Sequence, residues 1–166
     1  MLYTSNEANK LLKQYKEELN QEYLKERQSC KYTLSVDESA EGNVPEYDFE
    51  KTKLRIESLQ KTIRKIKHAI NVFNTTTNVE GFDMTVDEIL VALPMWNCRL
   101  LAVKEMAGIL PKTRKTISLS KFVEYEYANY DIEEAKAAYD TLQCLISYAQ
   151  TALDTLNNTK KFEIDI

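Results

Sequence analysis

The chain has 166 residues, of which 43% are hydrophobic and 29% charged, and its formal net charge is −4. These values are typical of a folded globular protein rather than a disordered one, and the length predicts a single domain over residues 1–166. The mixed, slightly negative charge argues against a dedicated DNA-binding protein, which would carry a basic face or stripe.

Long amphipathic helices are expected, because the chain has only three glycines and three prolines and its apolar residues recur every three or four positions. The first predicted helix covers residues 5–29 and takes Ser5 as its N-cap. Residues 30–47 lose the periodicity, so we predict a loop there, with a short extended piece at residues 32–36.

The second predicted helix, residues 48–73, has the most regular pattern and begins after Asp48 as its N-cap. Its apolar positions form a heptad seam made of Phe49, Thr52, Ile56, Leu59, Ile63, Ile66, Ile70 and Phe73. A helix of this length measures about 39 Å. One small chain rarely covers the whole seam of such a helix, which favours self-association. The helix is expected to break within residues 71–81.

The third predicted helix begins with a capping box formed by Thr85 and Glu88 and ends near residues 108–111. Pro94 lies inside this helix and should kink or interrupt it. The side chains expected to face the core are Val86, Leu90, Leu93, Leu100 and Met106.

The segment after this helix changes character. A basic stretch at residues 112–116 is followed by Ile117, Leu119, Val123 and two tyrosines, which predict one or two strands over residues 117–127. A last helix is expected after Asp131 and Glu134 as its cap, and the alternating tail, residues 162–166, should pair with the 117–127 strand. The predicted fold is therefore mainly α, with four long antiparallel helices in a bundle or coiled-coil-like arrangement and a small β element near 117–127.

Enzyme motifs are absent from the sequence, which has no glycine-rich phosphate loop, no nucleophile elbow and no paired-histidine metal site. The single histidine, His68, is on a polar flank of the second helix, where a surface role is far commoner than catalysis. We expect a protein that is not an enzyme and has no metal or cofactor. The unpaired spacing of Cys30, Cys98 and Cys144, the short longest apolar run at residues 89–96, and the lack of a visible signal peptide predict a cytoplasmic protein without membrane contact.

Uncharged hydrogen-bonding residues cluster after the second helix, where Asn71, Asn74, Thr75, Thr76, Thr77 and Asn78 fall within eight positions. A structural interpretation is that they stop the helix, since asparagine tolerates the left-handed conformation and threonine favours extended backbone. A functional interpretation is that their side chains bind the polar edges of a ligand. The structural interpretation is somewhat favoured, because it explains the asparagines well and the complete lack of charge less well.

Basic and aromatic residues form a second cluster, made of Lys112, Arg114, Lys115, Lys121, Tyr125, Tyr127 and Tyr130. Cations beside aromatic rings can hold a phosphorylated, base-bearing ligand through ion pairing and stacking. The simpler interpretation is that the tyrosines are ordinary half-buried strand residues. Arg99, one turn after Trp96 on the third helix, is a further candidate for contact with an anionic ligand.

The segment from Ile70 to Thr77, followed by residues 84–90, resembles the Ile-Asn-x-x-Asn-x-x-Thr signature and following helix of a bacterial family often labelled septicolysin. The similarity continues through residues 125–132 and 152–159 and so covers nearly the whole chain. The resemblance implies an all-helical, oligomer-forming domain and places Asn71 and Asn74 in the signature without giving them a chemical role. The chain has Leu93-Pro94 where the family often has Arg-Asp, and no membrane-inserting hairpin is visible.

Two classes of function are favoured, and a third, weaker interpretation is an enzyme that uses an unfamiliar site. The first is a homo-oligomer that binds or sequesters an anionic, nucleotide-like small molecule at a subunit interface, as a phage protein acting against host defence would. Its ligand-binding residues would be Asn71, Asn74, Thr75, Thr76, Thr77, Arg99, Lys112, Arg114, Tyr125 and Tyr127. The second is a helical scaffold that assembles with itself or holds another protein and binds no small molecule.

Overall fold

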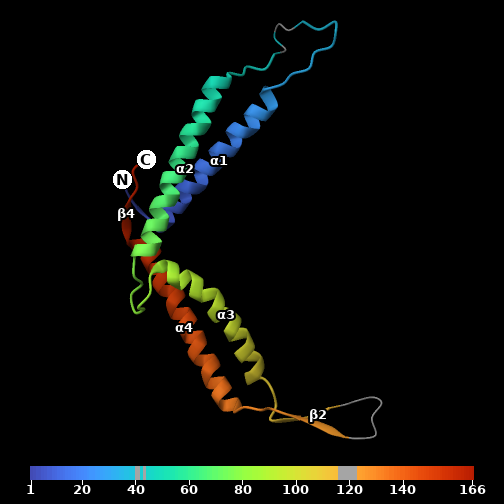
Figure 1. Cartoon of the computed structure of the whole chain (residues 1–166), viewed down its shortest axis with the longest axis vertical. Helices are drawn as coiled ribbons and strands as arrows, with labels where there is room; N and C mark the ends of the chain where they lie inside the picture. Colours follow the sequence, from blue (N-terminus) through green and yellow to red (C-terminus); the bar gives the residue numbers. More distant parts are fainter. Residues whose placement is uncertain (40–41, 43, 116–122) are drawn as a thin grey trace. The chain divides into compact units, whose positions relative to one another are not determined.

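The computed structural model describes residues 1–39, 42, 44–115 and 123–166. Two compact units make up the chain: unit 1 contains Met1–Asn74 and Asn157–Ile166, and unit 2 contains Thr75–Leu156. The sequence expectation of a single domain therefore stays a prediction. The expected mainly α fold is confirmed, with four long helices and two small antiparallel strand pairs (Figure 1). The expectations for Ile117, Leu119 and Lys121 lie outside the described residues.

Unit 1 is an antiparallel pair of helices, α1 (Ser5–Ser29) and α2 (Phe49–Thr76), completed by a sheet of two short strands (Figure 1). Residues 31–35 between the helices form neither helix nor strand, so the extended piece expected there is not a β-strand. The core contains Ala8, Leu12, Ile66, Ile70 and Ile164, all at most 8% exposed. Two residues of the predicted seam of α2 therefore pack against α1 and the C-terminal tail.

The two strands of unit 1 come from opposite ends of the described chain. Strand β1 (Leu2–Thr4) pairs antiparallel with β4 (Lys161–Glu163), with Leu2 opposite Glu163. The predicted pairing of the tail with residues 117–127 is therefore wrong. The alternation of Phe162 and Ile164 correctly indicated an extended tail, but a three-residue partner is too short to show a periodic pattern of its own.

The N-caps of the helices are those predicted from the sequence, except that the N-cap of α1 lies one residue earlier. Thr4, not Ser5, is the N-cap of α1: its hydroxyl accepts from the Glu7 N–H at 3.3 Å, and the Glu7 carboxylate accepts from the Thr4 N–H at 2.8 Å. This reciprocal box leaves Ser5 buried in the first turn. Asp48 caps α2 as predicted, since its carboxylate accepts from the Lys51 N–H at 3.0 Å.

The helix α2 ends within the predicted break of residues 71–81, but it continues through Thr76, three residues beyond the predicted end at residue 73. Asparagine and threonine are modest helix formers, but tertiary packing overrides such weak preferences. The ring of Phe73 is 4% exposed and stacks on Phe162 with a centroid distance of 4.6 Å. This contact holds the last turns of α2 against β4.

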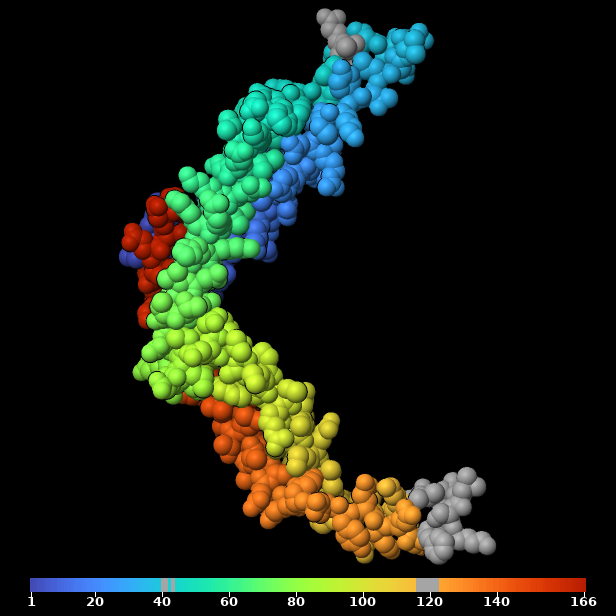
Figure 2. Space-filling view, viewed as in Figure 1, coloured from blue at the N-terminus to red at the C-terminus, as the bar shows by residue number. Residues whose placement is uncertain are grey.

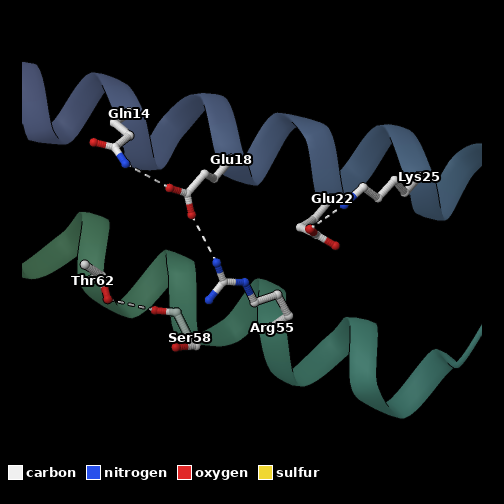
Figure 3. Close-up of polar contacts among 7 residues, drawn as sticks. All are labelled: Gln14, Glu18, Glu22, Lys25, Arg55, Ser58 and Thr62. Carbon is white, nitrogen blue, oxygen red and sulfur yellow. Dashed lines mark hydrogen bonds and ion pairs between the residues drawn. The ribbon is translucent and has the colours of Figure 1, made fainter.

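Polar side chains link α1 and α2 outside the apolar core (Figure 3). Arg55 on α2 donates to the Glu18 carboxylate on α1 at 3.0 Å, and the other oxygen of Glu18 accepts from the Gln14 side chain at 3.3 Å. All three side chains are at least partly exposed to water, so they contribute more to the alignment of α1 against α2 than to the stability of the fold.

Unit 2 contains α3 (Val86–Ala107), β2 (Lys112–Lys115), β3 (Glu124–Tyr127) and all but the last turn of α4 (Ile132–Thr159). Asp131 accepts from the Glu133 N–H at 2.8 Å at the start of α4, and the predicted box at α3 is confirmed, with the Glu88 carboxylate 2.7 Å from the Thr85 nitrogen. The helix α3 runs through Pro94 without ending. Leu90, expected to face the core, is 46% exposed, and the buried residues are Val86, Ile89 and Val103.

A tight loop joins α2 to α3. The Thr77 carbonyl accepts from the Val86 N–H at 2.9 Å, and Asn78 forms a β-bridge with Thr85. After it, Gly81 adopts a positive φ of 81°, and an added Cβ would overlap the Tyr148 ring. The next residue, Phe82, stacks on that same ring at a centroid distance of 5.4 Å. None of the described helices is long and apolar enough to span a membrane.

Candidate functional site

The β2–β3 hairpin has two chemically different faces. Its register places Lys112 opposite Tyr127 and Arg114 opposite Tyr125, while Thr113 and Lys115 lie opposite Glu126 and Glu124. Side chains alternate along a strand, and directly opposite residues share a face. One face therefore contains Lys112, Arg114, Tyr125 and Tyr127, and we call it the cationic–aromatic face. The other face contains Thr113, Lys115, Glu124 and Glu126.

The cation and the rings of the cationic–aromatic face are in direct contact. The ammonium nitrogen of Lys112 lies 4.1 Å from the ring centroid of Tyr125 and 5.3 Å from that of Tyr127. Both distances are within the range of a cation–π interaction. Tyr125 is 47% exposed and Tyr127 is 62% exposed, so both are strand residues with about half or more of the side chain open to solvent. Their rings are accessible to a ligand.

Two hydrogen bonds fix the base of the hairpin. The Ala128 N–H donates to the Pro111 carbonyl at 3.2 Å and extends the strand ladder by one step. The Tyr130 hydroxyl donates to the Met106 carbonyl at 2.7 Å. The Met106 carbonyl also accepts from the Ile109 N–H at 3.2 Å, so Tyr130 adds a second hydrogen bond at the end of α3 and ties the hairpin to it. The hairpin projects beyond the ends of α3 and α4 (Figure 1).

A cavity of about 480 Å³ lies beside this base and is lined by Ile109, Leu110, Thr113, Tyr127 and Asn129, among others. Tyr127 belongs both to the cavity and to the cationic–aromatic face. Thr113 and Glu126, which also line the cavity, belong to the opposite face of the hairpin, so the cavity borders the cationic–aromatic face only through Tyr127.

The Asn/Thr cluster, residues 71–78, mainly forms the end of α2 and the turn that follows it. Asn71, Asn74, Thr75 and Thr76 are in the last two turns of α2, and Thr77 is 4% exposed with its carbonyl bonded to Val86. The cluster is also divided, since Asn71 and Asn74 belong to unit 1 and the threonines to unit 2. The predicted binding loop is thus the end of a helix and the start of a tight turn.

Asn71 has neighbours that the sequence pattern did not single out as a site. It lines an open groove of about 420 Å³ together with Arg64, Lys67 and His68 of α2 and Leu19 of α1. Residues 64, 67, 68 and 71 are separated by three, one and three positions along α2, and this spacing could have indicated that they share one face of the helix. The groove lies in unit 1, whereas the hairpin lies in unit 2.

Arg99 is exposed on α3, eight residues before the last residue of the helix. This separation corresponds to about 12 Å along the helix axis, and Arg99 does not line the cavity beside the hairpin. Of the ten predicted ligand-binding residues, the structure therefore brings Lys112, Arg114, Tyr125 and Tyr127 together.

Tyr47, Glu7 and Glu88 have perturbed pKa values, and each shift has a structural explanation. Burial and the hydrogen bond to Glu26 at 3.2 Å raise the pKa of Tyr47, which packs the start of α2 against the end of α1. Hydrogen bonds from Thr4 and Thr85 lower the pKa of Glu7 and of Glu88 in the two capping boxes. Among the described residues, no group of three or more His, Cys, Asp or Glu side chains could hold a metal ion.

Comparison with known proteins gives a likeness of fold. No family model matches the sequence, and no curated protein matches it. The structure is similar to the crystal structure of a functionally unknown conserved protein from Corynebacterium diphtheriae, with a TM-score of 0.58 and 14% sequence identity. The match covers 98% of this chain and 100% of the other. At this identity the likeness shows a shared fold.

Proposed function

We propose that this protein is not an enzyme and that it binds an anionic, nucleotide-like ligand on the cationic–aromatic face of the β2–β3 hairpin. The observation that supports the proposal is the placement of two cations and two exposed tyrosine rings on one face of a hairpin with a fixed base. Lys112 and Arg114 would bind the phosphate, and Arg114 suits this role because its planar guanidinium can donate two parallel hydrogen bonds. Tyr125 and Tyr127 would stack on the base.

The face is open on one side, so a single hairpin covers a small ligand only in part. A second copy of the chain would supply the missing wall, which makes self-assembly part of the proposal. Sequestration of a nucleotide signal in the cytoplasm, as phage proteins acting against host defence achieve, requires no chemistry beyond such binding. The septicolysin-like resemblance, with its implied oligomer, agrees with this proposal.

Isothermal titration calorimetry tests the proposal with inorganic phosphate, mononucleotides, cyclic dinucleotides and a short single-stranded oligonucleotide as probes. We expect a nucleotide to bind more tightly than phosphate, because only a nucleotide can also stack. A preference for the oligonucleotide over every mononucleotide would assign the face to single-stranded nucleic acid.

Matched variants separate specific binding from general charge. Arg114→Ala should weaken nucleotide binding by about tenfold or more, as expected for loss of a charge-assisted contact of about 1.4 kcal/mol. Lys115→Ala removes the same charge from the opposite face and should change affinity by less than about twofold. Equal losses in the two variants, or no binding of any nucleotide, would remove the proposal. Asn74→Ala tests whether the Asn/Thr cluster adds to binding.

A second candidate function is a self-assembling helical scaffold without a small-molecule ligand. Exposed apolar side chains on α3 favour it, among them Val91 at 61%, Met95 at 67% and Leu101 at 64% exposure. Light scattering at micromolar concentration tests it, and a strictly monomeric chain would exclude it.

A further inference from the structure

The helix α3 is apolar on two sides. Its buried residues, Val86, Ile89 and Val103, lie on one side. On the opposite side is an exposed apolar strip that we call the outer stripe, made of Leu90, Val91, Pro94, Met95, Cys98 and Leu101. With 3.6 residues per turn, these six residues fall within an arc of about 140°. Atoms of α3, in yellow-green, are exposed along the helix in Figure 2.

A helix whose apolar residues cover two opposite sides normally packs both of them, so the outer stripe indicates a missing partner. Leu90, Val91, Met95 and Leu101 are 46–67% exposed. With Pro94 and Cys98 the stripe exposes on the order of 300 Å² of apolar surface, if a buried aliphatic side chain is taken to remove about 100 Å². Two copies would supply about 600 Å², most of the apolar part of an interface of about 1,200 Å², which is the lower size of a stable dimer.

Charged residues at one edge of the stripe specify how a second copy fits. Glu88 and Arg99 are eleven residues apart, close to three full turns, so both lie on the same edge of α3. In an antiparallel pair of identical helices, each edge meets the same edge of its partner. A two-fold axis near residues 93–94 places Glu88 of each copy against Arg99 of the other, whereas a parallel pair would bring this edge against the opposite edge of the partner and would not pair Glu88 with Arg99.

The same axis also brings the apolar residues together. The midpoint of the outer stripe, between Leu90 and Leu101, is within about two residues of the axis that pairs Glu88 with Arg99. Apolar burial and charge pairing therefore favour one arrangement.

We propose that two copies of this chain associate through the outer stripe of α3, with their α3 helices antiparallel and with two symmetric Glu88–Arg99 ion pairs. This inference rests on the self-assembly in the proposed function and names a surface for it. Because the hairpins follow the C-terminal ends of α3, the antiparallel pair places them at opposite ends, so the wall over each hairpin would come from another part of the partner.

Sedimentation velocity on the full chain tests the interface. The wild type should be a dimer at micromolar concentration, and Leu101→Glu and Val91→Glu should be monomers with unchanged helical circular dichroism. Leu54→Glu is the matched control, because Leu54 is 62% exposed on α2 and lies outside the stripe. That variant should stay dimeric. A monomeric wild type would overturn the inference. The outer stripe would then be covered by its own chain or stay uncovered.

The ion pairs are tested by variants that keep the fold. Glu88→Gln preserves the capping box, in which glutamine can replace glutamate, and removes both symmetric ion pairs. Glu88→Gln and Arg99→Gln should each weaken dimerisation several-fold, with a smaller dependence on salt than the wild type. A dimer that is insensitive to these changes and to Leu101→Glu would leave self-assembly intact and overturn the assignment to α3.

Crosslinking tests the antiparallel arrangement. In a background with Cys30, Cys98 and Cys144 replaced by serine, Pro94→Cys should crosslink efficiently between copies through a short bismaleimide, because residue 94 lies beside the two-fold axis. Ala137→Cys on α4, also exposed, should crosslink poorly. The reverse result would overturn the arrangement. Dimerisation of Arg114→Ala, measured in parallel, keeps this test independent of ligand binding on the hairpin.

Discussion

The rings of Phe73 and Phe162 stack with centroids 4.6 Å apart and an interplanar angle of 26°. One ring comes from the penultimate turn of α2 and the other from β4. The helix therefore continues through a segment rich in asparagine and threonine because its end is held by tertiary packing.

Replacing Phe162 by alanine should lower the free energy of unfolding by about 2 kcal/mol, below the range for a fully buried phenylalanine because Phe162 is only half-buried. The loss comes from the removed apolar contact with Phe73 and the cavity left beside it. Urea denaturation followed by circular dichroism measures the change. Phe49→Ala, at a position that is 58% exposed, is the control and should cost less than about 1 kcal/mol.

Gly81→Ala should destabilise unit 2 more than Gly42→Ala destabilises unit 1. Both glycines have a positive φ near 80°, so alanine is strained at either position, at a cost of about 1–2 kcal/mol. Only at residue 81 does the new Cβ also overlap the Tyr148 ring. Thermal melts of the two variants should therefore differ clearly. In a Tyr148→Ala background the extra cost at residue 81 should disappear, and its persistence would contradict the assigned cause.

Acidification should destabilise the protein through its capping boxes. The pKa values of Glu7 and Glu88 are lowered from 4.5 in the folded chain, mainly by hydrogen bonds from the backbone N–H groups of Thr4 and Thr85. A carboxylate with a depressed folded pKa stabilises the fold above its unfolded pKa, and that stability is lost as the pH falls through the folded value.

Melting temperatures measured from about pH 6 down to about pH 3 test this dependence. The Glu7→Gln/Glu88→Gln double variant should show a shallower decline below about pH 4.5 than the wild type, because its caps do not titrate. Identical pH profiles for the two proteins would show that other groups control the acid transition.

Arg55→Ala should change the free energy of unfolding by less than about 0.5–1 kcal/mol, despite the 3.0 Å ion pair with Glu18. The Arg55 side chain is 53% exposed and that of Glu18 is 33% exposed, so water already screens most of their attraction. A chemical denaturation curve shifted by much more would mean that the α1–α2 pair depends on this contact.

Much of the fold was predictable from local patterns. The seam of α2 and the box of Thr85 and Glu88 depend on residues close together in sequence. The box was identified correctly, and so was the seam from Ile56 to Phe73, whereas Phe49 at its start is 58% exposed. The partner of the C-terminal tail was not, because pairing with Leu2–Thr4 is set by tertiary packing across the whole chain. Leu90 was misplaced because α3 has apolar residues on two opposite sides, and the periodic pattern does not distinguish the inner side from the outer one.

The candidate site was predictable in composition but not in geometry. Lys112, Arg114, Tyr125 and Tyr127 stood out as cations near aromatics, yet their common face depends on the strand register. A shift of one residue would put Thr113 and Lys115 on the same face as the tyrosines in place of Lys112 and Arg114. The prediction that Asn71 and Asn74 belong to the same binding site depended on the expectation of a loop, and both residues lie in the helix α2.

Pairing of β1 with β4 has a consequence for biosynthesis. The Ile164 side chain is 1% exposed in the core of unit 1, and its N–H donates to the Met1 carbonyl at 2.9 Å. All of unit 2 lies between these partners in the chain. The ribosome makes all of residues 75–156 before residue 164, so the core of unit 1, which begins at the N-terminus, cannot be completed until the tail has been synthesised. The half of the protein that is translated first is thus the last to be closed.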